Sequence, residues 1–175
     1  NMGGKPFPIW FPPKDGPGYI YTGISRDGFE RNELVAEVSY AYRAVITEQI
    51  RLCNDQRQCS LQESVTGLGG DAPTSPVTVT RINKILAPKS DGVGVILDID
   101  VENVGGGNVI SSSAQDNVER VEFNIFSPGV VFNCRTEGGV IVLNDKKKTV
   151  RCTGDAILEG STPQDNPIDI ELIYN

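Results

Sequence analysis

Residues 93–103 have the sequence VGVILDIDVEN, in which apolar and acidic side chains alternate from Leu97 onward. Successive side chains of a β-strand point to opposite faces of its sheet. One face of this strand is apolar and consists of Val95, Leu97, Ile99 and Val101. The other face is acidic and carries Asp98, Asp100 and Glu102. The pattern predicts an antiparallel sheet with a core on one side and water on the other, because parallel sheets are usually buried on both sides.

The rest of the C-terminal part consists of similar short apolar runs. The predicted strands are residues 77–86, 93–103, 118–126, 130–134, 140–143, 149–152 and 168–174. Sequences such as PKSDG, SPG and TPQDNP separate them and favour turns. About seven short strands in about 100 residues are typical of an immunoglobulin-like fold. We therefore expect residues 75–175 to form an all-β, immunoglobulin-like antiparallel β-sandwich.

One turn in this part resembles a known family. The segment 99–109, IDVENVGGGNV, contains Asn103-Val104-Gly105 directly after a predicted strand. It is similar to the N-x-G turn of adhesion-related immunoglobulin-like domains of bacterial and archaeal cell-surface proteins. The resemblance covers only the C-terminal part and implies an extracytoplasmic sandwich used in structure or binding. Antibody-type domains fit less well, because no Trp lies between Cys134 and Cys152.

The run LVAEVSYAYRAVITEQIRL, residues 34–52, fits two patterns. At helical spacing it has an apolar stripe, whereas at strand spacing Tyr42, Ile46 and Ile50 share one face that only Glu48 interrupts. The many β-branched and tyrosine residues favour a long strand or two collinear strands, and a helix is the alternative. Residues 60–75, which end in GLGGDAPTS, predict a linker. Residues 34–66 are therefore expected to be a long strand or hairpin with a disulfide loop.

The chain has four cysteines, Cys53, Cys59, Cys134 and Cys152, which allow three pairings. The spacing of Cys53 and Cys59 does not match a zinc knuckle, and the sequence contains no His to complete a mixed site. We prefer the pairing Cys53–Cys59 and Cys134–Cys152, which indicates an oxidising compartment. The alternative is four reduced cysteines that act as small buried apolar residues.

Residues 1–33 contain many prolines and aromatic residues and predict an extended arm, because Pro fixes φ and removes a backbone donor. The large apolar side chains Phe7, Ile9, Trp10 and Phe11 need a groove and are the candidate partner contacts. The arm either packs over its own sandwich or docks on a neighbouring molecule. Prolines at alternate positions weaken strict strand addition, since each one removes a ladder donor.

Charge and composition exclude several functions. The net charge of −7 disfavours nucleic acid and anionic membranes as partners. The absence of His removes the commonest general base and zinc ligand, so we expect no enzyme, no metal and no cofactor. No apolar run is long enough to span a bilayer or to act as a signal peptide. If the protein is exported, this chain is therefore expected to be its mature or excised extracytoplasmic part.

Three further motifs have ordinary structural explanations. The acidic row Asp98, Asp100 and Glu102 can contribute oxygens to Ca²⁺, but a solvated outer face is the simpler interpretation. The glycines at 105–107 do not precede a predicted helix, which argues against a phosphate site. Residues 146–148 are three lysines at a predicted hairpin tip, where they keep a turn soluble and only secondarily suggest an anion site.

These observations predict a secreted or cell-surface protein with a structural or adhesive role. Its partners are other copies of itself or another surface protein, in an assembly such as a filament or envelope layer. The alternative is a secreted module that binds a carbohydrate or a partner protein. Such a module would use an aromatic platform of Tyr19, Tyr21, Tyr40 and Tyr42.

Overall fold

The computed structural model describes residues 41–55, 57–68, 75–105, 107, 109, 118–158 and 162–175. Every helix or strand within these residues is a β-strand. The strands are β1 (Tyr42–Leu52), β2 (Gln62–Thr66), β3 (Val77–Lys89), β4 (Gly92–Asn103), β5 (Glu119–Phe126), β6 (Asn133–Cys134), β7 (Val140–Leu143), β8 (Lys147–Ile157) and β9 (Gln164–Tyr174). The predicted arm, residues 1–33, lies outside the described residues.

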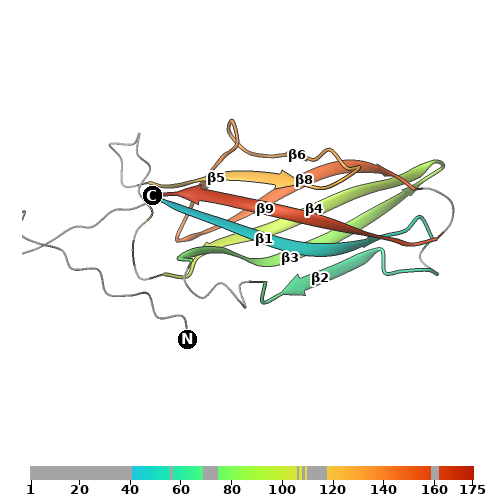
Figure 1. The fold of residues 1–175 in the computed structure, drawn as a ribbon, viewed down its shortest axis with the longest axis horizontal. Coiled ribbons are helices and arrows are strands. Elements are labelled where there is room, and N and C mark those ends of the chain that lie inside the picture. Colours follow the sequence, from blue (N-terminus) through green and yellow to red (C-terminus); the bar gives the residue numbers. More distant parts are fainter. Residues whose placement is uncertain are drawn as a thin grey trace, which may run out of the picture. The chain divides into compact units, whose positions relative to one another are not determined.

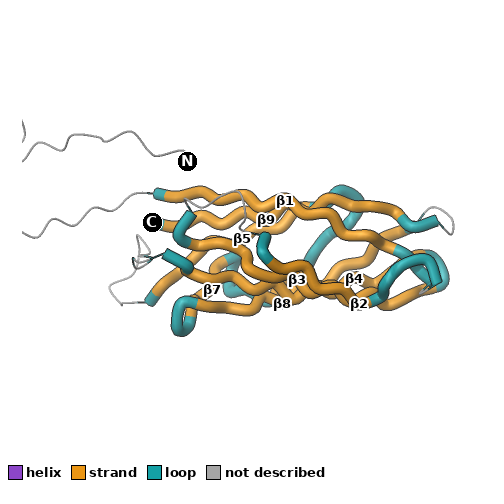
Figure 2. Tube along the Cα trace, turned by 90° about the horizontal axis from the view of Figure 1, so that it is seen from below, coloured by secondary structure: helices purple, strands orange, loops and turns teal. Residues whose placement is uncertain are grey.

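The strands form two antiparallel sheets (Figure 1). Sheet A has the order β1-β9-β5-β7, and sheet B has the order β2-β3-β4-β8-β6. Figure 2 shows β1, β9 and β5 on one side and β3, β4 and β2 on the other. The N-terminal strand β1 therefore pairs with the C-terminal strand β9, along a continuous register from Tyr42–Tyr174 to Leu52–Gln164.

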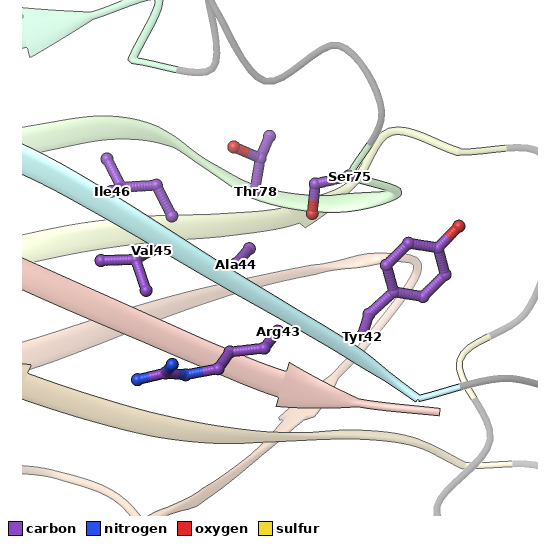
Figure 3. A pocket seen from close by; sticks show the side chains of 7 residues that line it. All are labelled: Tyr42, Arg43, Ala44, Val45, Ile46, Ser75 and Thr78. Atoms are coloured by element: carbon purple, nitrogen blue, oxygen red, sulfur yellow. The ribbon is translucent and has the colours of Figure 1, made fainter. Parts of the chain in front are cut away.

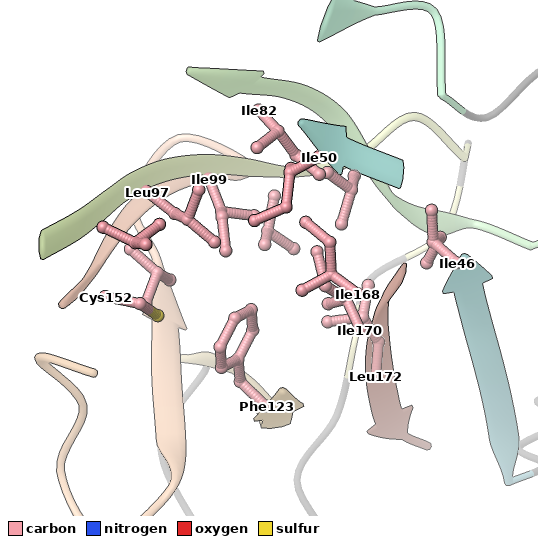
Figure 4. Packing of buried hydrophobic residues seen from close by; sticks show 14 of the residues in the cluster. Ile46, Ile50, Ile82, Leu97, Ile99, Phe123, Cys152, Ile168, Ile170 and Leu172 are labelled. Carbon is pink, nitrogen blue, oxygen red and sulfur yellow. The ribbon is translucent and has the colours of Figure 1, made fainter. Parts of the chain in front are cut away.

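One hydrophobic core joins the two sheets in a sandwich-like arrangement (Figure 4). Sheet B contributes the predicted apolar face of β4, whose four side chains are at most 1% exposed. They are Val95, Leu97, Ile99 and Val101. Sheet A contributes Phe123 of β5 and three fully buried side chains of β9, which are Ile168, Ile170 and Leu172. The alternation of β4 thus correctly predicts which face of the strand is buried.

Residues 42–52 form a strand, so the helical alternative is wrong for this part of the run. Ile46, Ile50 and Leu52 point into the core, as the strand pattern predicts. Glu48 interrupts the buried face and is half-buried, which is consistent with its place on an edge strand. The preceding residues, 34–40, lie outside the described part of the chain.

Several boundaries differ from the sequence prediction, and β8 and β9 are longer than the strands predicted at 149–152 and 168–174. The predicted linker at 60–75 contains the strand β2, which pairs with Arg81–Ile85 of β3 in sheet B. The predicted strand at 130–134 is reduced to an isolated bridge at Val130 and to the two residues of β6. Since β1 and β2 are edge strands of the two sheets, they belong to the same compact unit as the rest, Ser39–Asn175.

The turn between β7 and β8 is a two-residue hairpin. Asp145 and Lys146 both have positive φ, of 50° and 68°, and Asn144 and Lys147 exchange two backbone hydrogen bonds. This is the geometry expected of a hairpin in which both central residues have left-handed φ. Of the three lysines predicted at the tip, only Lys146 lies in the turn, because Lys147 and Lys148 begin β8.

Candidate interaction site at the edge of the two sheets

A small cavity lies at the N-terminal end of β1, between the edges of the two sheets (Figure 3). Its volume is about 200 Å³. The lining residues come from β1, from the start of β3 and from the segment just before β3, and are Tyr42, Arg43, Ala44, Val45, Ile46, Ser75 and Thr78. We call this cavity the edge notch.

The notch exists because β2 is shorter than the strand it covers. The register of β2 with β3 ends at Thr66–Arg81, while β3 begins four residues earlier at Val77. One edge of β1 pairs with β9. The Arg51 carbonyl points away from the other edge of β1, where it accepts a hydrogen bond from Lys84. Backbone groups of alternate residues point to the same side of a strand, so those of Val45 line the notch edge of β1.

Tyr174, at the end of β9, connects the two sheets near the start of β1. Its hydroxyl accepts a hydrogen bond from the backbone N–H of Val77 at 3.1 Å and is 2.8 Å from the Ser75 hydroxyl. Its ring stacks on that of Tyr42, with 5.4 Å between the ring centroids. A buried tyrosine hydroxyl needs such polar partners. The last residues of β9 are therefore joined to the first residues of both β1 and β3.

Lys84 makes the corresponding contact near the other end of β1, at Arg51. Its side chain is only 3% exposed, although it lies between Ile82 and Leu86 on the core-facing side of β3. The ammonium donates hydrogen bonds to the Arg51 carbonyl of β1 at 2.9 Å and to the Glu63 carboxylate of β2 at 2.8 Å. A buried charge is tolerated only when it is paired and hydrogen-bonded. Lys84 therefore connects both edge strands to β3.

The outer face of the β1–β9 pair carries complementary charges. Arg43 pairs with Glu171, and Arg51 forms two hydrogen bonds with Asp165, at 2.8 and 3.0 Å. Between these two pairs, the Thr47 hydroxyl donates to Asp169 at 2.6 Å. The hydrogen bond from Arg51 lowers the pKa of the Asp165 carboxyl, and the hydrogen bond from Arg43 does the same for the pKa of Glu171. The basic groups all lie on β1 and the acidic groups all lie on β9.

Two of the three acidic side chains of the β4 row, Asp98 and Asp100, are paired with cations, which argues against use of the row as a calcium site. Arg151 of β8 donates to both oxygens of Asp98, at 2.6 and 2.7 Å. Asp100 accepts from Arg81 at 2.9 Å and from Thr149 at 2.5 Å. Asp100 is also only 2% exposed, so the predicted solvated face is wrong at this position.

These ion pairs favour the charged carboxylates. The hydrogen bond from Arg151 lowers the pKa of the Asp98 carboxyl below its ordinary value. Burial raises the pKa of Asp100, but the hydrogen bond from Thr149 and the charges of Lys147 and Arg81 outweigh it, so this pKa is lowered too. In the described part of the chain, no three acidic, Cys or His side chains come together in a way that would hold a metal ion.

Asn103 organises the turn that carries the N-x-G resemblance. Its side-chain oxygen accepts the backbone N–H of Gly105 at 3.1 Å, and its amide nitrogen donates to the Glu119 carboxylate at 3.0 Å. A Cβ atom at Gly105 would lie 2.7 Å from the Cβ of Pro76. The glycine is therefore required by the close approach of Pro76.

Both disulfides follow the preferred pairing. Cys53–Cys59 closes the loop between β1 and β2, and Cys134–Cys152 joins β6 to β8. The predicted partner contacts Phe7, Ile9, Trp10 and Phe11 lie outside the described residues, as do Tyr19, Tyr21 and Tyr40 of the proposed aromatic platform. Tyr42, the remaining member of that platform, is half-buried against Tyr174.

Sequence reasoning missed Lys84 and the notch. A signal for Lys84 exists in the run VTVTRINKIL, residues 77–86. Its apolar positions change from odd numbers, Val77 and Val79, to even numbers, Ile82 and Leu86, and the structure has a β-bulge between Val79 and Arg81. After this change of phase, Lys84 is on the buried face. The notch depends on the length of β2, which has only one apolar residue.

No protein-family model matches the chain, and neither a curated protein sequence nor a solved structure matches it. Within the described residues there is also no helix with the length and apolar character needed to cross a bilayer.

Replacing Lys84 with Met is expected to destabilise the fold by about 1–3 kcal/mol, because the Arg51 carbonyl loses the hydrogen bond that the buried ammonium donates. Lys89, whose exposed ammonium pairs with Asp155, is the matched control, and Lys89→Met should change stability by less than about 1 kcal/mol. Urea unfolding measures both. Equal losses in the two variants, or a gain for Lys84→Met, would contradict the assigned role.

The paired carboxylates predict acid sensitivity. A carboxyl whose pKa is lower in the folded state stabilises the fold above its unfolded pKa, about 3.8 for Asp, and this contribution is lost as the pH falls through the folded pKa. The free energy of unfolding should therefore fall below about pH 4. Asp98→Asn should lose less stability between pH 6 and pH 3 than the wild type. Asp91→Asn, at the exposed β3–β4 turn, should follow the wild-type pH profile.

Proposed function

We propose that the chain is a structural or adhesive subunit of an extracellular assembly. The observation that carries this proposal is the edge notch, a recess between two sheet edges among the described residues, in a chain whose N-terminal arm is rich in apolar side chains. Exposed sheet edges are the places where β-proteins associate, and soluble monomers usually cover them. A chain that has both a recess and an apolar arm has the two parts that an assembling subunit needs.

Export is supported by the cysteines. All four are in disulfides, and disulfides persist mainly in extracytoplasmic compartments. Cys134–Cys152 joins neighbouring strands of sheet B, and Cys53–Cys59 closes the loop at the end of β1. The resemblance of the Asn103-Val104-Gly105 turn to cell-surface domains favours the same location.

The strand order supports an immunoglobulin-like topology. In such a domain, sheet ABED faces sheet GFC, and variable-type domains add strand C′ beside C. Assigning β3, β4 and β8 to A, B and E places β6 at position D, while β5, β9 and β7 occupy C, F and C′. The chain differs in that β6 precedes β7. It also differs at position G, beside F, which is filled by the N-terminal strand β1.

The arm is the proposed occupant of the notch on a neighbouring copy. The notch is lined by Ala44, Val45 and Ile46 and by the hydroxyls of Ser75 and Thr78, so it offers apolar surface and hydrogen-bonding groups together. An extended segment that carries large apolar groups and few backbone donors is suited to filling such a recess. It is less suited to extending a sheet along its full length.

The rival function, a secreted module that binds carbohydrate or another protein, receives less support. An aromatic platform needs exposed rings, whereas Tyr42 is half-buried in its stack with Tyr174. The truncation experiment below distinguishes the two functions, because only the assembling subunit requires the arm to connect separate molecules.

The proposal predicts that the full chain assembles and that a chain beginning at Lys14 does not. The shorter chain lacks Phe7, Ile9, Trp10 and Phe11 but retains every described strand. Light scattering after size exclusion, with negative-stain microscopy, should show large particles for the full chain and a folded monomer for the truncated one. Ala44→Arg in the full chain should also reduce assembly by filling the notch, whereas Gln49→Arg, on the exposed side of β1, should not.

If the full chain and the truncated chain are both monomeric, and the truncation lowers the melting temperature, then the arm packs on its own molecule. The proposed assembly would then be wrong, and the binding module would be the better hypothesis. If Ala44→Arg unfolds the protein, the truncation result alone decides.

A further inference from the structure

The edge strands β1 and β2, with the loop between them, form a module that is not covalently cross-linked to the rest of the fold. We define the edge module as residues 41–68 and the body as residues 75–175. The disulfide Cys53–Cys59 lies within the edge module, and Cys134–Cys152 lies within the body. Only the main chain at 69–74 joins the two parts, so the edge module can be exchanged without breaking a disulfide.

The body needs the edge module to complete both sheets. Without β1, the edge of sheet A would be β9, whose buried side chains Ile168, Ile170 and Leu172 pack in the core with Ile46 and Ile50. The β1–β9 register is the longest continuous pairing of sheet A. Without its own edge module, the body would therefore have an unpaired β9 edge that any copy of β1 could cover.

The charged contacts between the edge module and the body make the pairing of β1 with β9 specific. Every basic group on the outer face of the pair belongs to the edge module, and every acidic group belongs to the body, as in Arg43–Glu171 and Arg51–Asp165. Opposite charges across an antiparallel pair are stabilising, and like charges are destabilising. The two pairs lie eight residues apart along β1, so a shifted register would separate the charges.

Lys84 and Tyr174 recognise the ends of the same strand. Lys84 belongs to the body, and both of its partners, the Arg51 carbonyl and Glu63, belong to the edge module. Tyr174 of the body stacks on Tyr42 of the edge module. These contacts have the same geometry whether the edge module comes from the same chain or from another one.

We infer that the edge module of one copy pairs with the β9 edge of a second copy, in an exchange whose register is specified by the Arg43–Glu171 and Arg51–Asp165 pairs. The inference rests on the proposed function as an assembling subunit and deepens it: the arm precedes the edge module in the sequence, and its docking on a second copy is what brings the edge module there, so a chain beginning at Lys14 keeps its own edge module. The connection at 67–76 has about ten residues and would span at most about 35 Å if fully extended. Each copy donates one edge module and accepts another, so the contact is head-to-tail and produces an open chain of copies unless it closes into a ring.

Charge reversal tests the exchange in the full-length chain. The first variant, Arg43→Glu with Arg51→Glu, has an acidic β1, and the second variant, Asp165→Lys with Glu171→Lys, has a basic β9. Each places like charges across its own β1–β9 pair and should melt about 3–6 °C below the wild type. A third variant carries all four substitutions, restores opposite charges within one chain, and should melt close to the wild type.

The two double variants are then unfolded together in denaturant, without reductant, and refolded with an affinity tag on one of them. If the edge module is exchanged, mixed pairs have opposite charges at every junction. The untagged variant should co-purify in about equal amount, and the mixture should melt in one transition near that of the wild type. Under the same treatment the tagged wild type should capture untagged wild type but not the four-fold variant, because that mixture places like charges together.

Exchange is overturned if nothing co-purifies from the mixture and the two variants melt separately while the four-fold variant is stable. Light scattering on the wild type then separates the two proposals. If the wild type assembles, the structural role stands and the junction is elsewhere. If the wild type is monomeric, both proposals fail.

Discussion

The pairing of the first described strand with the last one is the constraint on which the rest of the structure depends. β9 is formed by the last residues of the sequence, and its side chains Ile168, Ile170 and Leu172 are fully buried. A strand with so much apolar surface cannot remain at a bare edge, because its backbone groups and its core side chains would both meet water. β1 covers this edge over eleven residues and adds Ile46, Ile50 and Leu52 to the core. The fold thus closes through a contact of high sequence separation.

Polar groups make this closure specific. Apolar burial holds β1 against the core. It excludes a shift of the register by one residue, because such a shift would turn the apolar side chains to the outer face. Two ion pairs and one hydroxyl contact align β1 with β9 on the outer face, while Lys84 and Tyr174 hold its two ends from the inside. Each of these contacts joins residues that are far apart in the sequence. The same separation makes the closure available to a second copy, since neither disulfide ties β1 to β9.

Local pattern predicts much of this fold because alternation reports which face of a strand is buried. It identifies the core face of β4, the strand character of β1 and the preferred cysteine pairing. It does not predict β2, whose sequence QESVT has almost no apolar signal, since backbone pairing with β3 rather than burial maintains it. It also misses the burial of Asp100 and Lys84, because charged residues are normally placed outside and only tertiary partners reverse this. The edge notch depends on where β2 ends, a boundary that no local pattern marks.

Amide hydrogen exchange tests the central claim most directly, because it reports the opening of individual strands. If the β1–β9 pairing closes the fold, the amides of β1 and β9 should be protected to a similar degree in the wild type. Arg43→Glu with Arg51→Glu should accelerate exchange in both strands together, and by more than in β4 and β8. The account is contradicted if β1 exchanges rapidly in the wild type while β9 stays protected, since β9 would then not depend on β1.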